Sequence, residues 1–305
     1  IVMGAAWAYE SLSFGGYWAW DPVENMSLVP WLVLIAALHA HLIAIHTKYS
    51  IRASIIFYIL TFVLVVYSSF LTRSGVLGDS SVHAFTQLGL EWQLLGFLIL
   101  VTCIPTYFYI KQQKEIPAHK TEEKIASREF WMFIGSLILL FSAGLMTFTT
   151  SIPVFNKLID VAGQIMNTSY ASYHRSAPVD VMAHHNRFQV WIGVFIGIIS
   201  AIAFMLRYLG TQLNGLQQGF WKKLIAVISI SGLLTLATFS LFSNHSIPII
   251  SLLFTGWFAI VSNLYILTTI IKNNPKSATA IISHIGFGIL LFGILFTGMN
   301  SENIA

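Results

Sequence analysis

Long uncharged apolar runs, separated by short polar segments, make up most of this chain. Each run is close to the ~20 residues that a helix needs to cross the ~30 Å hydrocarbon core of a bilayer. The runs lack the strict alternation of apolar and polar residues that is typical of barrel strands. We therefore predict an all-α fold, a polytopic membrane helix bundle of about eight full transmembrane helices plus the tail of another at 1–9, with full spans at 28–47, 53–72, 92–110, 130–152, 188–206, 224–246, 247–271 and 277–301.

Composition supports this prediction and excludes other classes of protein. Of the 305 residues, 56% are hydrophobic and only 9% are charged, whereas a soluble domain is about one quarter charged. The single cysteine, Cys103, lies inside an apolar run, which excludes a disulfide framework, a CxxC redox pair and a cysteine zinc site. The chain begins at Ile1 without an initiator methionine, so we expect it to be a fragment of a longer protein.

The basic residues predict the orientation of the spans. If the spans alternate in direction, segments on one side carry 12 of the 16 lysines and arginines, and segments on the other side carry the remaining 4. By the positive-inside rule, the richer side is the cytoplasm. The net charge of +4 then describes topology and indicates no nucleic-acid partner.

The same alternation predicts how the chain is organised. The segments that face outward include an aromatic segment at 10–27, a polar loop at 73–91 and a long loop at 151–187. A charged, proline-containing segment is expected to be a cytoplasmic linker between two halves. The predicted boundaries are 1–112 for the N-terminal half, 113–127 for the linker and 128–305 for the C-terminal helical bundle.

The aromatic segment combines tryptophans with carboxylates. In FGGYWAWDPVENMSLVPW, Trp18 and Trp20 lie beside Asp21, Glu24 and Asn25. One interpretation is an interfacial aromatic belt, followed by a helix whose N-terminus is capped by acidic residues. The other is a flat aromatic platform that holds a large planar ligand.

Two sequence blocks resemble one known family. GGYWAWDPVENMSLVPWL resembles the tryptophan-rich WWD signature of haem-handling proteins of cytochrome c maturation. Its WDPVEN core is similar to the CcmF family of haem lyase subunits, whereas the sister family CcsA carries WDPKET at this point. FLTRSGVLGDSSVHAF at 70–85 resembles a second CcmF block, which follows two spans later in both. The chain thus resembles a CcmF-type haem lyase subunit.

Two histidines are predicted at similar depths in different spans. His39 lies 11 residues past Leu28, about 16 Å below the outer face, and His284 lies 7 residues past Ser277, about 19 Å from that face. Such a pair could ligate one haem, or each could be hydrogen-bonded across helices. His41 is as deep as His284, so depth leaves His39 and His41 both open. The resemblance chooses His39 and His284, whose contexts correspond to the family's transmembrane ligands of a buried haem b.

The resemblance also implies a second haem, bound as substrate at the outer WWD surface. His83 corresponds to an axial ligand of its iron, and Arg73 is the candidate partner of a propionate, with an ordinary interfacial arginine as the alternative. The second external ligand of the family is expected upstream of Ile1. The haem-facing platform would comprise Trp18, Trp20, Asp21, Glu24 and Asn25.

Three histidines in the loop 151–187 have no assigned role. His184 and His185 are adjacent, and His174 precedes them. A zinc site is a weak alternative, because adjacent ligands are awkward and the sequence offers no evident third one.

The function implied by the resemblance is that of a holocytochrome c synthase, or cytochrome c haem lyase, acting within a complex. It would receive haem from a periplasmic haem chaperone and direct thioether attachment to the CxxCH motif of apocytochrome c. The buried haem, supplied with electrons by quinol, would reduce the transferred haem. Other maturation subunits are further expected partners, and the location is the bacterial inner membrane with the WWD segment facing the periplasm.

Two alternatives of other classes remain open. One is a haem transport or presentation protein without ligation chemistry, and the other is a quinol-linked b-haem redox subunit. A small-solute transporter is disfavoured, because the spans lack charged pairs and the chain shows no inverted repeat.

Overall fold

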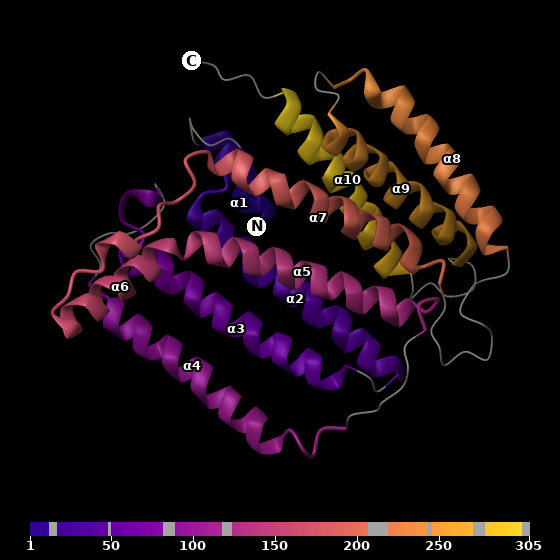
Figure 1. Ribbon diagram of the computed structural model, residues 1–305. Helices are drawn as coiled ribbons and strands as arrows, with labels where there is room; N and C mark the ends of the chain where they lie inside the picture. The colour runs from indigo at the N-terminus through magenta and orange to yellow at the C-terminus, as the bar shows by residue number, and fades with distance from the viewer. Residues whose placement is uncertain are drawn as a thin grey trace. The chain divides into compact units, whose positions relative to one another are not determined.

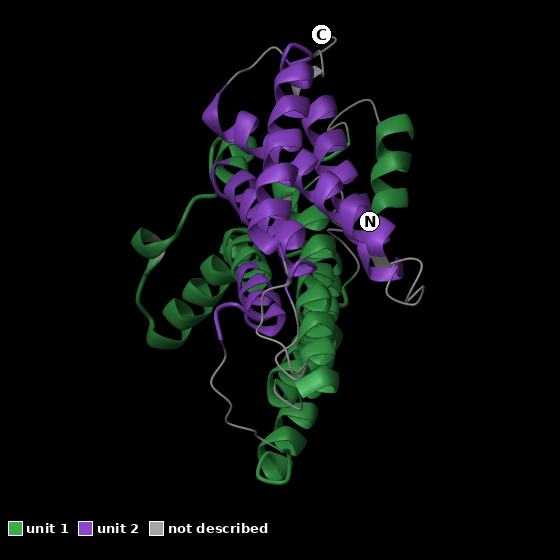
Figure 2. Cartoon of the chain, turned by 90° about the vertical axis from the view of Figure 1, so that its right-hand side faces the viewer, with its two compact units in different colours: residues 1–119, 139–186 green, residues 120–138, 187–305 purple. Residues whose placement is uncertain are grey.

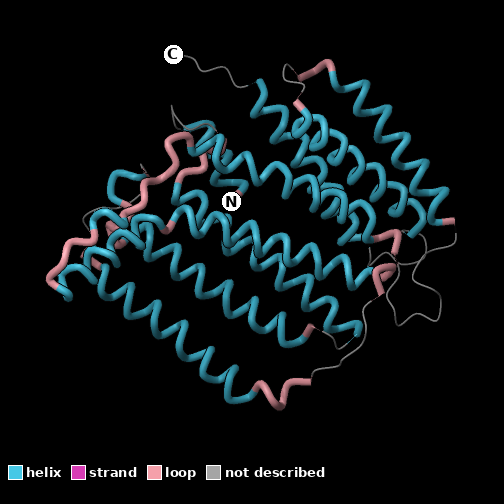
Figure 3. Tube along the Cα trace, viewed as in Figure 1, coloured by secondary structure: helices cyan, strands magenta, loops and turns pink. Residues whose placement is uncertain are grey.

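The computed structural model describes residues 1–11, 17–47, 50–81, 89–117, 124–206, 219–242, 246–270 and 278–300. Within these ranges the structure contains helices and no strands (Figures 1 and 3). Two short 3-10 turns are η1 (Gly78–Ser80) and η2 (Ala171–Tyr173). The α-helices are α1 (Val2–Ser11), α2 (Pro22–Thr47), α3 (Ile51–Arg73), α4 (Glu91–Gln112), α5 (Arg128–Thr150), α6 (Ile152–Met166), α7 (Val181–Ala203), α8 (Phe220–Phe239), α9 (Ile247–Ile270) and α10 (Ala278–Asn300).

Eight of these helices are long and apolar enough to cross a membrane, all except α1 and α6. This confirms the predicted polytopic helical fold, and each predicted span corresponds to one of the eight helices. The span boundaries differ most at the end of α8, which ends at Phe239 instead of near residue 246, and at the start of α7, which begins at Val181 instead of near residue 188. The polar residues of its first two turns made this stretch look like a loop.

The predicted loop 151–187 is therefore shorter than expected and contains a helix of its own. Ser151 alone separates the last residue of α5 from the first residue of α6. Pro153 near the start of α6 has a fixed φ that suits the first turn of a helix.

The described chain divides into two compact units, coloured separately in Figure 2. Unit 1 comprises 1–119 and 139–186, and unit 2 comprises 120–138 and 187–305. Two helices, α5 and α7, contribute residues to both units. The sequence-based division at 112 and 128 remains a prediction.

In unit 1, α2 packs against α3, and α3 packs against α4. The fully buried side chains of α2 recur every three or four residues, which places them on one face of the helix. Ala36 and Ala40 are consecutive small residues on this face, so a neighbouring helix can approach closely there. The buried set includes Met26, Val29, Val33, Ala36, Ala40 and Ile43.

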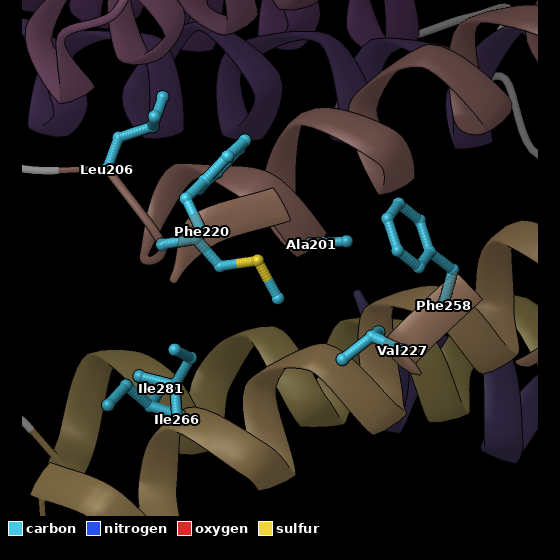
Figure 4. Packing of buried hydrophobic residues seen from close by; sticks show 8 residues of the cluster. Ala201, Leu206, Phe220, Val227, Phe258, Ile266 and Ile281 are labelled. Atoms are coloured by element: carbon cyan, nitrogen blue, oxygen red, sulfur yellow. The ribbon is translucent and has the colours of Figure 1, made fainter. Parts of the chain in front are cut away.

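In unit 2, α9 packs against both α8 and α10. The main apolar cluster contains Ala201, Phe258, Ile266 and Ile281 from three helices (Figure 4). Lipid is as apolar as these side chains, so close packing and polar contacts drive the association of helices that the hydrophobic effect drives in water.

Polar side chains join α7 to α9 inside unit 2. Ser262 Oγ donates a hydrogen bond to the carbonyl of Ala201. The neighbouring Asn263 Nδ2 donates to the carbonyl of Ser200 over 3.3 Å. Both side chains are fully buried, where such bonds are protected from competition with water.

Candidate functional site

The N-terminus of α2 is closed by two carboxylates. Asp21 Oδ1 accepts a hydrogen bond from the backbone N–H of Val23 over 2.8 Å. In return, Glu24 Oε2 accepts one from the N–H of Asp21 over 3.1 Å, and a second from Ala19 over 2.9 Å. Asp21, three residues before Glu24, thus forms a reciprocal capping box. Pro22 suits the first helical position because its missing N–H would have no intrahelical partner.

Asn25 connects this helix start to the end of α5. Its side chain is only 2% exposed. Nδ2 donates to the carbonyl of Trp20 over 3.0 Å and to Thr150 Oγ1 over 3.5 Å. Within unit 1, the capping carboxylates fix the backbone of the aromatic segment, and Asn25 links it to the end of α5.

Trp20 is fixed from several directions. Its φ of +55° lies in the left-handed region, which costs a non-glycine residue about 1–2 kcal/mol. The indole Nε1 donates to Asn186 Oδ1 over 3.0 Å. The Trp20 ring stacks on the His185 ring, with centroids 4.9 Å apart and planes 19° apart. Strain of this kind persists only where surrounding contacts over-determine the conformation.

Trp18 lies edge-on to Trp20, with ring centroids 5.9 Å apart and an interplanar angle of 88°. Its Nε1 is buried and has no hydrogen-bond partner among the described residues. A buried N–H without an acceptor is costly. An acceptor atom of a ligand, such as a carboxylate oxygen of a haem propionate, would satisfy it.

The loop after α3 also reaches the capping carboxylates. Ser81 Oγ donates to Asp21 Oδ1 over 2.8 Å, and Arg73 is the exposed last residue of α3. The chain thus returns to the aromatic segment at Ser81, two residues before His83. His83 itself lies outside the described residues.

His39 and His284 have the same local geometry, each within its own unit. The Nδ1 of His39 is 2.8 Å from the carbonyl oxygen of Ile35, and the Nδ1 of His284 is 2.8 Å from that of Ala280. A carbonyl can only accept, so both bonds require the proton on Nδ1 and leave the lone pair on Nε2. Metal-ligating histidines commonly have this arrangement.

His41 differs from this pair. Its Nδ1 is 3.3 Å from the hydroxyl of Tyr58, and the two rings meet edge-on. Its ring is therefore oriented by another helix and not by the carbonyl one turn earlier. This contrast favours His39 over His41 as a ligand, a choice that depth alone left open.

The surroundings of His284 include a helix terminus. Its ring meets the Phe204 ring edge-on, with centroids 5.1 Å apart. The Arg128 guanidinium lies over the Phe204 ring, 4.6 Å from the ring centroid. The guanidinium also donates to the carbonyls of Ala203 and Phe204 over 3.0 and 3.1 Å, which closes the C-terminus of α7.

Residues outside the predicted site also contact the aromatic segment around Trp20. His185, only 4% exposed, and Asn186 hold Trp20, although no role was predicted for either residue. His184 Nε2 is 3.3 Å from Thr149 Oγ1, while His174 Nε2 is 2.8 Å from Asp160 Oδ1. No three His, Cys, Asp or Glu side chains gather as a metal site in the part of the chain that the structure describes.

The available signal for His185 and Asn186 was a polar AHHN stretch directly before a long apolar run. Polar residues at the start of a helix are ordinary, so the stretch by itself could not identify Trp20 as their partner. Asn186 lies 166 positions from Trp20 in the sequence.

Comparison with known families gives matches to cytochrome c assembly proteins. Residues 1–77 match the family described as "Cytochrome C assembly protein". The cytochrome c-type biogenesis protein CcmF of Haemophilus influenzae is 34% identical over 161 residues, which cover 52% of this chain and 24% of that protein. The CcmF N-terminal-like mitochondrial protein 2 of Arabidopsis thaliana is 33% identical over 135 residues, which cover 42% of this chain and 62% of that protein.

A solved structure named cytochrome c heme lyase CcmF has the same fold, with a TM-score of 0.67 at 19% identity. The similarity covers 97% of this chain but only 42% of that lyase chain. The chain thus spans less than half of the solved lyase, and its matched region spans about a quarter of the Haemophilus influenzae protein.

Proposed function

The relatives and the shared fold support a CcmF-type cytochrome c maturation protein, and on that premise we propose that this chain is part of a haem lyase subunit. It receives haem from a periplasmic haem chaperone and directs its attachment to the CxxCH motif of apocytochrome c. Each cysteine thiol adds across a haem vinyl group, so that an S–C bond forms and the thiol hydrogen moves to the vinyl carbon. The protein works with other maturation subunits.

The observation that carries this proposal is the fixed tryptophan pair at the start of α2. Trp20 is held by a stacked ring and two hydrogen bonds in a strained conformation, and Trp18 presents an N–H that has no acceptor among the described residues. A planar ligand with carboxylate groups suits both features: its plane contacts the aromatic rings and a propionate accepts from Trp18.

The other outer residues take distinct parts in the proposal. Asp21, Glu24 and Asn25 shape the platform by fixing the backbone of its tryptophans. Arg73 binds a propionate, since a guanidinium matches a carboxylate with two parallel hydrogen bonds. His83 is an axial ligand of the outer haem iron.

For the inner site, we propose that His39 and His284 hold a b-type haem. The shared bond from Nδ1 to the carbonyl one turn earlier supports this, since it leaves Nε2 as the ligand atom in each ring. When bound, this haem would supply an electron, received from quinol, for reduction of the outer iron. The two histidines bind and orient it, and the apolar spans exclude water.

The proposed location is the bacterial inner membrane, with the start of α2 at the periplasmic face. The eight apolar helices support a multi-pass membrane protein, and the asymmetry of lysine and arginine supports the orientation. Haem, the chaperone and the apocytochrome then meet on the side where Trp18 and Trp20 lie.

The test of the outer site is haem occupancy of the purified protein with Trp18→Ala or Trp20→Ala. We expect outer haem to be lost while the inner haem spectrum is retained, and unchanged occupancy would refute the platform. Co-expression with the partner subunits and an apocytochrome tests the chemistry. Thioether-linked cytochrome is the expected product, and its absence at full haem occupancy would favour a haem-presentation protein.

The test of the inner site is the reduced-minus-oxidised visible spectrum. A low-spin b-type signal should disappear in His39→Ala and in His284→Ala, and persist in the control His41→Ala. Loss in His41→Ala instead would overturn the assignment. If His83→Ala leaves all bound haem in place, the quinol-linked redox subunit becomes the better description.

A further inference from the structure

We propose that α6 is an interfacial helix, which lies along the membrane surface with one apolar stripe in the boundary between lipid headgroups and acyl chains. The stripe consists of Leu158, Val161 and Ile165. The proposal concerns the lipid bilayer as a binding partner and does not depend on the haem chemistry proposed above.

The connection between α5 and α6 fixes α6 at the end of a membrane span. Only Ser151 separates the two helices, and this residue is buried, at 2% exposure. Its Oγ lies 2.6 Å from the hydroxyl of Tyr67 in α3. The chain therefore turns at a corner anchored to a second span, so α6 starts at the level where α5 leaves the bilayer.

The length of α6 suits a surface helix and not a crossing. Its 15 residues span about 22 Å, short of the ~30 Å hydrocarbon core. It ends at Met166. The next residue, Asn167, has a φ of +51°, and the N–H of Thr168 donates to the carbonyl of Gly163 over 2.9 Å. A left-handed residue followed by such a hydrogen bond is a common way for an α-helix to end.

Two parallel stripes on α6 differ sharply in polarity. Leu158, Val161 and Ile165 are 60%, 41% and 76% exposed and follow the i, i+3, i+7 spacing of one helix face. The residues directly before them, namely Lys157, Asp160 and Gln164, have the same spacing and are also exposed. A helix with one exposed apolar face and one polar face is the form that binds in the plane of a membrane interface.

The loop that follows α6 returns to its polar side. Asp160 is bonded to His174 over 2.8 Å. Asn156 exchanges two bonds with the backbone of Arg175: its Nδ2 donates to the carbonyl over 2.8 Å, and its Oδ1 accepts from the N–H over 2.9 Å. His174 and Arg175 thus bond to polar residues of α6, whereas the apolar stripe stays exposed.

Continuity with the lipid-facing surface of α5 identifies lipid as the occupant. Phe148, in the last turn of α5, is 52% exposed on a helix that crosses the membrane. Its ring centroid is 5.4 Å from that of Phe155 in α6. The apolar surface of the span therefore continues through Phe155 onto α6.

The experiment uses the full chain, with Cys103→Ser as the background, reconstituted in vesicles of phosphatidylethanolamine and phosphatidylglycerol. Spin labels are attached to Leu158→Cys and Ile165→Cys, and the matched controls are Lys157→Cys and Gln164→Cys, each one position earlier. Power saturation compares access of oxygen, which partitions into lipid, with access of Ni-EDDA, which stays in water.

We expect labels at 158 and 165 to be more accessible to oxygen than to Ni-EDDA, and labels at 157 and 164 to show the reverse. Equal access of Ni-EDDA to all four positions would overturn the proposal in favour of a helix in water. Labels at 158 and 165 that neither reagent reaches would also overturn it, because a protein partner or a second copy would then cover the stripe. These readings require no bound haem.

Discussion

The stack between Trp20 and His185 should couple the two residues energetically. His185→Ala removes a ring whose centroid lies 4.9 Å from that of Trp20. Stacked aromatic pairs contribute about 0.5–1.5 kcal/mol beyond buried area. The backbone strain of Trp20, at φ +55°, costs about 1–2 kcal/mol.

Without the stack, Trp20 keeps two hydrogen bonds, to Asn186 and from Asn25. Such bonds each contribute about 0.5–1.5 kcal/mol, which is close to the strain that they oppose. We therefore expect His185→Ala to release Trp20 from its single conformation. A platform populated only part of the time would bind outer haem about 2- to 12-fold more weakly, the factor that corresponds to the loss of the stack.

The assay is a double-mutant cycle of Trp20→Ala and His185→Ala. The free energy of unfolding is measured in mixed micelles with increasing SDS, which needs no haem. The expected coupling is about 0.5–1.5 kcal/mol. His174→Ala is the matched control, since its described partner is Asp160, and it should not couple to Trp20.

Additivity of the two substitutions within about 0.3 kcal/mol would refute the reasoning. A haem titration then provides a second reading. His185→Ala should weaken outer haem binding in the wild-type background and have no further effect once Trp20 is alanine. An equal effect in both backgrounds would mean that His185 acts on haem by another route.

Three further predictions concern helix packing and helix termini, and each is tested by the free energy of unfolding. Gly288→Ala should destabilise the protein by about 1–3 kcal/mol, because the new Cβ would lie 2.7 Å from the Ile260 side chain. The control is Gly286→Ala, whose Cβ would meet nothing within 4 Å and which should be neutral or stabilising. Equal effects of the two substitutions would contradict the predicted clash at Gly288. Glu24→Ala should cost about 1–3 kcal/mol, because two backbone N–H groups lose a charged acceptor, while Glu24→Gln should retain part of the cap. Arg128→Lys should lose about 1 kcal/mol or more, since an ammonium cannot reproduce the forked donation to two carbonyls; full retention would refute that role.

The sequence alone predicted the helical membrane fold and the family resemblance, and both are confirmed. Hydropathy is a property of consecutive residues, and a span of apolar residues must form a helix in lipid to satisfy its own backbone. The acidic cap of α2 could also be predicted from sequence, because the two residues of a capping box are only three positions apart. Motif blocks such as WDPVEN are likewise contiguous.

Tertiary structure decided the features whose partners are distant in sequence. Trp20 meets Asn186 across 166 positions, and no local pattern specifies that pairing. The beginning of α7 was misplaced because its first-turn polar residues looked like loop, although their side chains are satisfied by contacts with other segments. His39 and His41 were equivalent by depth and became distinct only through their hydrogen-bond partners. Depth follows from counting residues, whereas the orientation of a ring depends on which atoms the fold places next to it.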